Sequence, residues 1–249
     1  MKPMDLPVQQ GDDLWTEARV RRCLAENWAF ERTVPAPLSP DGPFSQAFGW
    51  HNQGAASVRS DYDLNPHDPV APEKELTPAA VLVPIVLRPG GATVLLTQRT
   101  AHLHDHPGQV AFPGGRMDPG DRSPVDTALR ETLEEIGLSA NKIELSRSLD
   151  PYVTGTGYHV IPVVGLIPGS LDHERDLTLD AFEVAKAFEV PLYWLLQPEN
   201  RKQYHTWRNG VERYYFSFPW QGMDIWGATA GMLVDLLDRL RADLPRTEA

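Results

Sequence analysis

Residues 123–138 read SPVDTALRETLEEIGL, a stretch that predicts a helix with both of its ends marked. Ser123 is a suitable N-cap, and Pro124 follows at the first helical position, where its missing amide proton costs nothing. Gly137 is a suitable C-terminal stop, so we expect the helix to span residues 124–136.

This predicted helix has an apolar face and an acidic face. With successive residues about 100° apart, one side carries a core-facing stripe formed by Val125, Ala128, Leu129, Leu133 and Ile136. Glu131, Glu134 and Glu135 fall on the opposite side, at positions i, i+3 and i+4. One interpretation is a solvated acidic face, in which the like charges repel weakly. The other is a site for a hard cation such as Mg²⁺, because carboxylate oxygens are the ligands that this ion prefers.

A glycine-rich loop before the helix favours the cation site. Residues 112–115 read FPGG, and paired glycines allow the backbone to approach a ligand or a metal closely. Such a turn is common by itself, but its place shortly before a carboxylate-bearing helix makes the pattern informative. Arg130 could brace one of the carboxylates through a forked hydrogen bond.

The rest of the chain mixes predicted strands and helices. Residues 79–87 and 92–99 are expected to form a hairpin around a turn at residues 88–91. We also expect strands at 143–149 and 158–167, short apolar pieces at 192–196 and 214–218, a loop over 100–123, and helices at 13–28 and 226–244.

The N-terminal part has a different texture. Prolines recur without a period between residues 34 and 78, so this stretch is expected to be an extended, irregular arm. It is either a flexible linker or a strap packed on the domain, and we favour the strap because it carries the apolar anchors Phe44, Phe48, Trp50 and Tyr62. We therefore divide the chain into an N-terminal helix and arm, residues 1–78, and a globular domain, residues 79–249.

Composition narrows the functional classes. The chain has 249 residues, with 34 acidic side chains against 23 lysines and arginines, and a formal net charge of −11. This acidity argues against nucleic-acid binding, which depends on neutralising phosphates with cationic side chains. The single cysteine, Cys23, cannot form an intramolecular disulfide, and no apolar run approaches the roughly 20 residues of a membrane helix. With no signal-like apolar stretch over residues 1–13, we expect a cytoplasmic protein without membrane attachment.

The helix and the loop before it resemble the sequence box of the Nudix hydrolase family, which reads Gly, five residues, Glu, seven residues, then Arg-Glu-apolar-x-Glu-Glu-x-Gly-apolar. The second half is present as residues 130–138, RETLEEIGL, with Thr132 at the apolar position. In the first half, Gly115 lies one residue further from the arginine than the general box requires. Asp118 and Asp121 are the acids nearest to the place of the missing glutamate, and we favour Asp121.

The offset and the aspartates are typical of one branch of that family, the coenzyme A pyrophosphatases. The branch adds Leu-Leu-Thr-x-Arg-Ser/Ala, then Arg, Gly and Phe-Pro-Gly-Gly at fixed spacing. Here residues 95–100 read LLTQRT and are followed by His104, Gly108 and residues 112–115 at the same spacing. Thr100 replaces Ser/Ala, and His104 replaces an arginine by a side chain that titrates near neutrality. Residues 157–165 and 222–230 also resemble this branch.

The resemblance implies an α/β fold, an α/β/α sandwich with a mixed β-sheet. It implies hydrolysis of the diphosphate bond of CoA or acyl-CoA to 4′-phosphopantetheine and adenosine 3′,5′-bisphosphate, with Mg²⁺ or Mn²⁺ as cofactor. It also suggests a homodimer that acts on a small-molecule substrate. The alternatives are hydrolysis of another nucleoside diphosphate derivative, such as ADP-ribose or a dinucleotide, and a catalytically silent nucleotide-binding domain.

The resemblance also assigns roles to the residues of the box. Glu131 and Glu135 are the first choice as metal ligands, and the carbonyl of Gly115 would complete the coordination sphere. Glu134 is a third ligand or the group that receives the proton of the attacking water. Arg130, Glu131 and Glu134 are therefore the expected catalytic set.

Four further residues are candidates for substrate binding. Arg99 and Arg116 could hold phosphate oxygens. His104 alternates with His102 and His106, and these histidines either bind a transition metal or the 3′-phosphate of CoA, or lie in a solvated loop. Tyr158 either stacks on the substrate or ends a strand.

Overall fold

The computed structural model describes residues 15–26, 59–65, 76–103, 106–169, 171–208 and 210–241. Most of the expected arm, including Phe44, Phe48 and Trp50, therefore lies outside the described residues, as does His104. Of the arm, the structure places residues 59–65 against the domain, because strand β1 (Arg59–Ser60) pairs in parallel with strand β7 (Tyr152–Val153).

Strands and helices alternate along the described chain. The larger sheet contains β1, β2 (Thr77–Leu87), β3 (Thr93–Arg99), β4 (Val110–Ala111), β5 (Gly114–Arg116), β6 (Glu144–Ser148), β7, β8 (Tyr158–Pro168) and β9 (Val184–Pro191). The smaller sheet contains β10 (Lys202–Arg208), β11 (Val211–Trp220) and β12 (Met223–Trp226). The α-helices are α1 (Glu17–Glu26), α3 (Pro124–Ile136), α4 (His173–Asp176), α5 (Leu192–Leu195) and α6 (Ala228–Arg241). Short 3-10 turns lie at Ala140–Lys142 and Pro198–Asn200.

The larger sheet is mixed, as expected. Strands β2 and β8 run parallel over their whole length, from the pair Thr77↔Tyr158 to the pair Leu87↔Pro168. Strands β2 and β3 form the expected antiparallel hairpin, with Ile85 opposite Val94. Parallel strands that are buried on both faces need apolar side chains on both, and β2 is apolar throughout its buried part.

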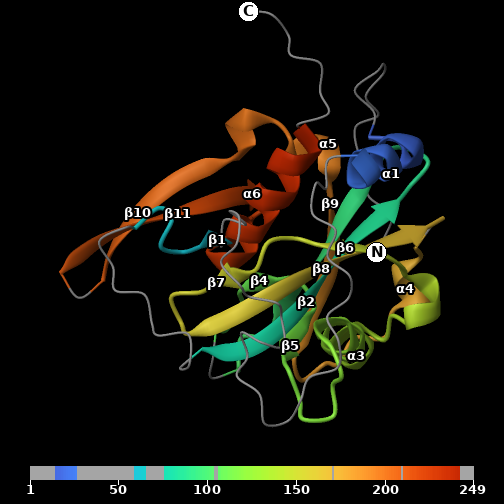
Figure 1. The fold of residues 1–249 in the computed structure, drawn as a ribbon, viewed down its shortest axis with the longest axis horizontal. Coiled ribbons are helices and arrows are strands. Elements are labelled where there is room, and N and C mark those ends of the chain that lie inside the picture. Colours follow the sequence, from blue (N-terminus) through green and yellow to red (C-terminus); the bar gives the residue numbers. More distant parts are fainter. Residues whose placement is uncertain are drawn as a thin grey trace, which may run out of the picture.

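Helices cover both faces of this sheet (Figure 1). Alternate residues of β2 pack into two separate cores, with Leu82 in the core under α3 and Val83 in the core under α6. Ala128 and Ile136 of α3 belong to the first core, and Leu233 of α6 belongs to the second. The expected three-layer α/β arrangement is therefore confirmed. Within the described residues, each helix is too short or too polar to span a bilayer.

Several elements differ from the expectations. The smaller sheet, strand β9 and the short strands β4 and β5 inside the expected loop were not predicted. The apolar piece at residues 192–196 forms helix α5 rather than a strand. Helices α1 and α6 are shorter than the expected ranges of 13–28 and 226–244.

Helix α3 has the predicted ends. The Ser123 hydroxyl accepts a hydrogen bond from the Asp126 amide at 3.2 Å, and Gly137 adopts a left-handed conformation with φ 68°. The apolar stripe was wrong at one position, because Leu133 is 52% exposed whereas the neighbouring Thr132 is fully buried. The Thr132 hydroxyl is satisfied inside the helix by donating to the Ala128 carbonyl at 2.6 Å, so a polar residue can occupy the core-facing position.

Candidate active site

The three glutamates of α3 lie in three different environments. The side chain of Glu134 is largely exposed, that of Glu131 is mostly buried, and Glu135 is only 6% exposed as a residue. Glu135 was expected on the acidic face but lies against the core beside Thr132 and Ile136. The helix therefore presents its carboxylates as a graded series from solvent into the protein.

The glycine pair allows the sheet to approach this helix closely. Strand β5 pairs with β2, with Gly115 opposite Ala80 and Gly114 opposite Val81. A Cβ atom on Gly115 would lie 2.6 Å from the carboxyl carbon of Glu131, and one on Gly114 would lie 2.4 Å from the Ala80 carbonyl oxygen. Only glycine fits at either position, so the expected role of the FPGG loop in a close backbone approach is supported by the geometry.

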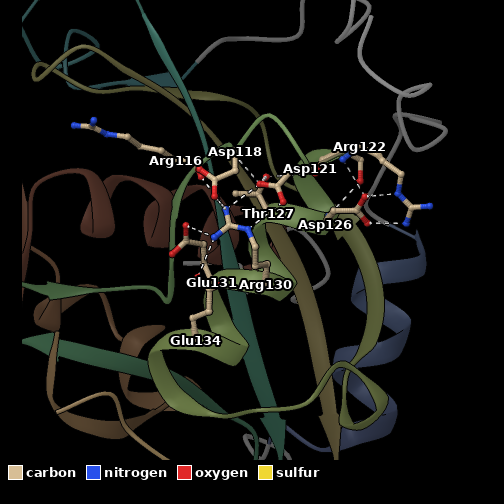
Figure 2. A network of polar contacts seen from close by, with 10 residues as sticks. Arg116, Asp118, Asp121, Arg122, Asp126, Thr127, Arg130, Glu131 and Glu134 are labelled. Carbon is tan, nitrogen blue, oxygen red and sulfur yellow. Dashed lines mark hydrogen bonds and ion pairs between the residues drawn. The ribbon is translucent and has the colours of Figure 1, made fainter. Parts of the chain in front are cut away.

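Arg130 and Asp121 form a forked ion pair at the start of this arrangement (Figure 2). The Asp121 carboxylate accepts from Arg130 Nε at 3.0 Å and from Nη2 at 2.9 Å. It also accepts from the Thr127 hydroxyl at 2.8 Å and from the Asp118 amide at 2.9 Å. The hydrogen bonds from Arg130 outweigh the effect of burial and lower the pKa of Asp121 to about 2. Asp121, favoured as the acid of the box, thus holds the arginine in place.

The same guanidinium reaches two of the glutamates. Arg130 Nη1 donates to Glu131 Oε1 at 2.9 Å and to Glu134 Oε2 at 3.0 Å, and Nη2 donates to the Arg116 carbonyl at 3.1 Å (Figure 2). Arg130 therefore connects the loop that follows β5 with successive turns of α3. This agrees with the expected bracing role of the arginine.

Glu135 is a buried carboxylate next to a second carboxylate. Burial, followed by the charge of Glu131, raises the pKa of Glu135 to about 8. Burial is also the main cause that raises the pKa of Glu131. Within the part of the chain that the structure describes, Glu135 Oε2 has no hydrogen-bond partner. Both observations fit a bound cation, which would supply the missing partner and hold the carboxylates ionised.

The side chains are not gathered as a closed metal site. Among the described residues, no group of three or more His, Cys, Asp or Glu side chains is close enough to hold a metal ion. The reason is visible in the contacts, because Arg130 binds one oxygen each of Glu131 and Glu134. The donors nevertheless fit a hard cation: they are carboxylate oxygens, and one buried oxygen is left without a partner.

The structure brings together two of the four substrate candidates. The Tyr158 hydroxyl accepts from Arg116 Nη2 at 2.6 Å, and the guanidinium lies 5.4 Å from the Tyr158 ring centroid. Arg99 ends strand β3, and its charge acts to lower the pKa of Glu135, so it lies near the carboxylates. The prediction for His104 falls outside the described residues. His102 packs edge-to-face on Phe182, with ring centroids 4.9 Å apart.

One acidic residue near the glutamates was not anticipated. The charge of Glu183, just before β9, acts on both Glu131 and Glu135 and raises the pKa of each. Glu183 lies 48 residues after Glu135 (183 − 135) and belongs to no motif. No periodic pattern in the sequence could have found it, because its position depends on the pairing of β9 with β3.

Residues 76–207 match the family model described as NUDIX domain. The chain is 40% identical over 163 residues to a protein named "Uncharacterized Nudix hydrolase NudL" from Yersinia pestis (strain Pestoides F), covering 65% of this chain and 79% of the relative. A protein of the same name from Yersinia pseudotuberculosis serotype O:1b (strain IP 31758) matches with the same values.

Two solved structures are also similar. The crystal structure of a Nudix hydrolase from M. smegmatis, RenU, is 26% identical, covers 47% of this chain and 71% of that chain, and gives a TM-score of 0.40. The NUDIX domain of Shewanella oneidensis NrtR, solved as a complex with ADP ribose, is 23% identical, covers 55% of this chain and 85% of that chain, and gives a TM-score of 0.36.

Proposed function

The chain belongs to the Nudix family and is a hydrolase of nucleoside diphosphate derivatives, and from this premise we propose that its substrate is coenzyme A or an acyl-CoA. The products are 4′-phosphopantetheine and adenosine 3′,5′-bisphosphate. The specific support is the spacing of residues 95–100, Gly108 and residues 112–115, which resembles the CoA pyrophosphatase signature. The proposed enzyme acts in the cytoplasm, and the proposed homodimer and the division at residue 78 rest on the sequence.

The observation that carries the hydrolytic function is the buried, unpartnered Oε2 of Glu135 beside Glu131 and the Gly114–Gly115 backbone. Glu131 and Glu135 would hold a divalent cation, Mg²⁺ or Mn²⁺, together with the Gly115 carbonyl. Bound there, the cation would neutralise the diphosphate charge and lower the pKa of a water molecule. A diphosphate repels an anionic nucleophile, so this neutralisation is the main contribution required from the site.

The other residues of the network position groups and move a proton. Arg130 fixes Glu131 and Glu134 relative to the loop through its bonds to Asp121 and the Arg116 carbonyl. Glu134 is the exposed member of the series, and in this proposal its carboxylate receives the proton of the attacking water. Arg99 and Arg116 bind phosphate oxygens, and Tyr158 holds the guanidinium of Arg116 in place.

One observation favours a second candidate. His104 stands where the CoA branch has an arginine, so a permanent positive charge for the 3′-phosphate is replaced by a titrating one. This change favours a substrate without a 3′-phosphate, such as ADP-ribose or a dinucleotide. A silent nucleotide-binding domain is the third alternative, and the presence of all three glutamates argues against it.

A substrate panel separates these functions. The full chain is incubated with Mg²⁺ or Mn²⁺ and with CoA, acetyl-CoA, ADP-ribose or a dinucleotide, and the products are separated by chromatography. We expect kcat/KM for CoA to exceed that for ADP-ribose by more than about tenfold, with 4′-phosphopantetheine released. The reverse preference would reject the CoA proposal. Binding of metal and nucleotide without turnover of any diphosphate would establish the silent domain, and E135Q serves as the inactive reference.

A further inference from the structure

We propose that Glu183 supplies a carboxylate ligand to the same divalent cation as Glu131 and Glu135, and that Thr100 positions it. The inference rests on the proposed metal-dependent function. It adds to the helix a ligand from a second element, the loop that leads into β9.

The loop before β9 is attached to the end of α3. The Thr178 amide donates to the Ile136 carbonyl at 2.8 Å, and the Asp180 amide donates to the Glu135 carbonyl at 2.9 Å. These are carbonyls of the last helical turn, which have no partner inside a helix. The loop therefore takes its position from the residue whose side chain is the buried carboxylate.

The other side of the loop is attached to the end of β3. The Thr100 amide donates to the Glu183 carbonyl at 2.9 Å, and the Thr100 hydroxyl donates to the Phe182 carbonyl at 2.7 Å. Thr100 is buried, and the preceding Arg99 is the register partner of Val184. Thr100 thus fixes the backbone of Glu183 from both the main chain and the side chain.

Between these two attachments the loop is a tight turn. The amides of Glu183 and Val184 both donate to the Asp180 carbonyl, at 3.1 and 2.8 Å, and the Asp180 carboxylate accepts from the Phe182 amide at 2.9 Å. Glu183 therefore starts from a backbone with little freedom to move away from α3.

Three carboxylates from two elements meet at this place. The charge of Glu183 is felt by both Glu131 and Glu135, which are themselves held close to the Gly115 backbone. Glu183 is half-buried, and Glu135 Oε2 is buried with no hydrogen-bond partner among the described residues. Without a cation these charges repel, whereas a divalent cation would draw them together. A buried oxygen without a partner, facing two further acids, is what a missing cation leaves behind.

The test measures Mn²⁺ binding to the full chain by electron paramagnetic resonance of the free ion. The variants are E183Q, the matched control E199Q, in which an exposed glutamate outside the site changes in the same way, and the reference E135Q. We expect E183Q to weaken Mn²⁺ binding by at least about tenfold and E199Q to bind as the wild type. Wild-type affinity in E183Q would overturn the proposal.

The same experiment distinguishes this failure from failure of the proposed function. If the wild type binds no Mn²⁺, the metal-dependent function itself is rejected. If the wild type binds and E135Q does not, while E183Q binds normally, only the role of Glu183 is rejected. Thermal unfolding adds a second readout, because E183Q should lose part of the Mn²⁺-induced rise in Tm without a lower Tm in the absence of metal.

The positioning role of Thr100 has its own test. T100V removes the hydroxyl that holds the Phe182 carbonyl, and T100S keeps it. We expect weaker Mn²⁺ binding in T100V and recovery in T100S, whereas equal affinities would reject the role. Thr100→Ala provides a second hydroxyl-free variant if the valine variant does not fold.

Discussion

Arg130 and Asp121 face each other through two parallel hydrogen bonds, Nε to Oδ1 at 3.0 Å and Nη2 to Oδ2 at 2.9 Å. The pair joins the loop after β5 to the helix that carries the glutamates. Because a third nitrogen of Arg130 reaches Glu131 and Glu134, the aspartate controls the carboxylates at one remove. A fork of this kind fixes direction as well as distance.

Asp121→Asn should therefore reduce activity and stability together. It removes one charge from the fork and leaves Arg130 free to turn, with a loss of about 2 kcal/mol in the free energy of unfolding. Urea unfolding and kcat/KM measure the two effects. Arg122→Gln is the control, because the Arg122–Asp126 ion pair has an arginine side chain that is 80% exposed and should change stability by less than about 1 kcal/mol. Equal effects of the two variants would contradict the bracing role.

Gly115→Ala should disable the site while the fold persists. The new Cβ would lie 2.6 Å from the carboxyl carbon of Glu131, so the carboxylate must move. A displacement of this size can lower kcat by about a hundredfold. Gly120→Ala is the matched control, since a Cβ there meets no atom within 4 Å. Steady-state kinetics with circular dichroism check the prediction, and an active Gly115→Ala protein would refute it.

Glu135→Gln should remove the stabilisation that metal gives without harming the metal-free protein. Burial and the neighbouring Glu131 both oppose the charge of Glu135, and a neutral amide avoids this opposition. We expect a metal-free Tm equal to or above that of the wild type, and no increase on adding Mg²⁺ or Mn²⁺. Differential scanning calorimetry with and without metal measures both quantities. A metal-dependent rise in the variant would show that Glu135 is not a ligand.

Glu189 makes stability depend on pH in the acidic range. Its carboxylate is buried, which opposes ionisation, but Arg88, His173 and Thr93 donate hydrogen bonds that lower its pKa to about 2. A pKa below that of the unfolded chain means that the contribution is complete above about pH 4.5 and is lost as the pH falls toward 2. The contribution at pH 7 is about 3 kcal/mol.

Glu189→Gln tests this dependence. Unfolding by urea should show a large loss of stability relative to the wild type at pH 7 and a much smaller one at pH 3. Glu144→Gln is the control, because the Glu144 side chain is half exposed in its pair with Arg21 and its loss should be small at both pH values. A difference for Glu189→Gln that does not shrink with acidification would contradict the assignment.

Local signals in the sequence were sufficient for the elements nearest to the site. Ser123, Pro124 and Gly137 mark the ends of α3 correctly, because caps act within one turn. The hairpin of β2 and β3 was predicted from its turn and its flanking β-branched residues. Adjacent positions defeated the same reasoning at Leu133 and Thr132, since the burial of each depends on how the helix is rolled against the sheet.

Features that depend on distant pairing could not be predicted. Strand β10 is polar and exposed along most of its length, so it has no alternation to show, and it is a strand because β11 pairs with it. The graded burial of the three glutamates follows from the close approach of β5, which one helix taken alone does not contain. The position of Glu183 likewise needs the register of β9 on β3.

The parallel ladder between β2 and β8 has a consequence for how the protein forms. Its partners are separated by the whole of the glycine loop, α3 and β6, so a large loop must close before the first rung gives any return. Chains dominated by such distant rungs reach the native state in about milliseconds to seconds rather than in microseconds. The nucleus that brings Thr77 to Tyr158 also brings β5, bonded to β2, beneath the helix, so completion of the ladder and assembly of the catalytic centre are one kinetic event.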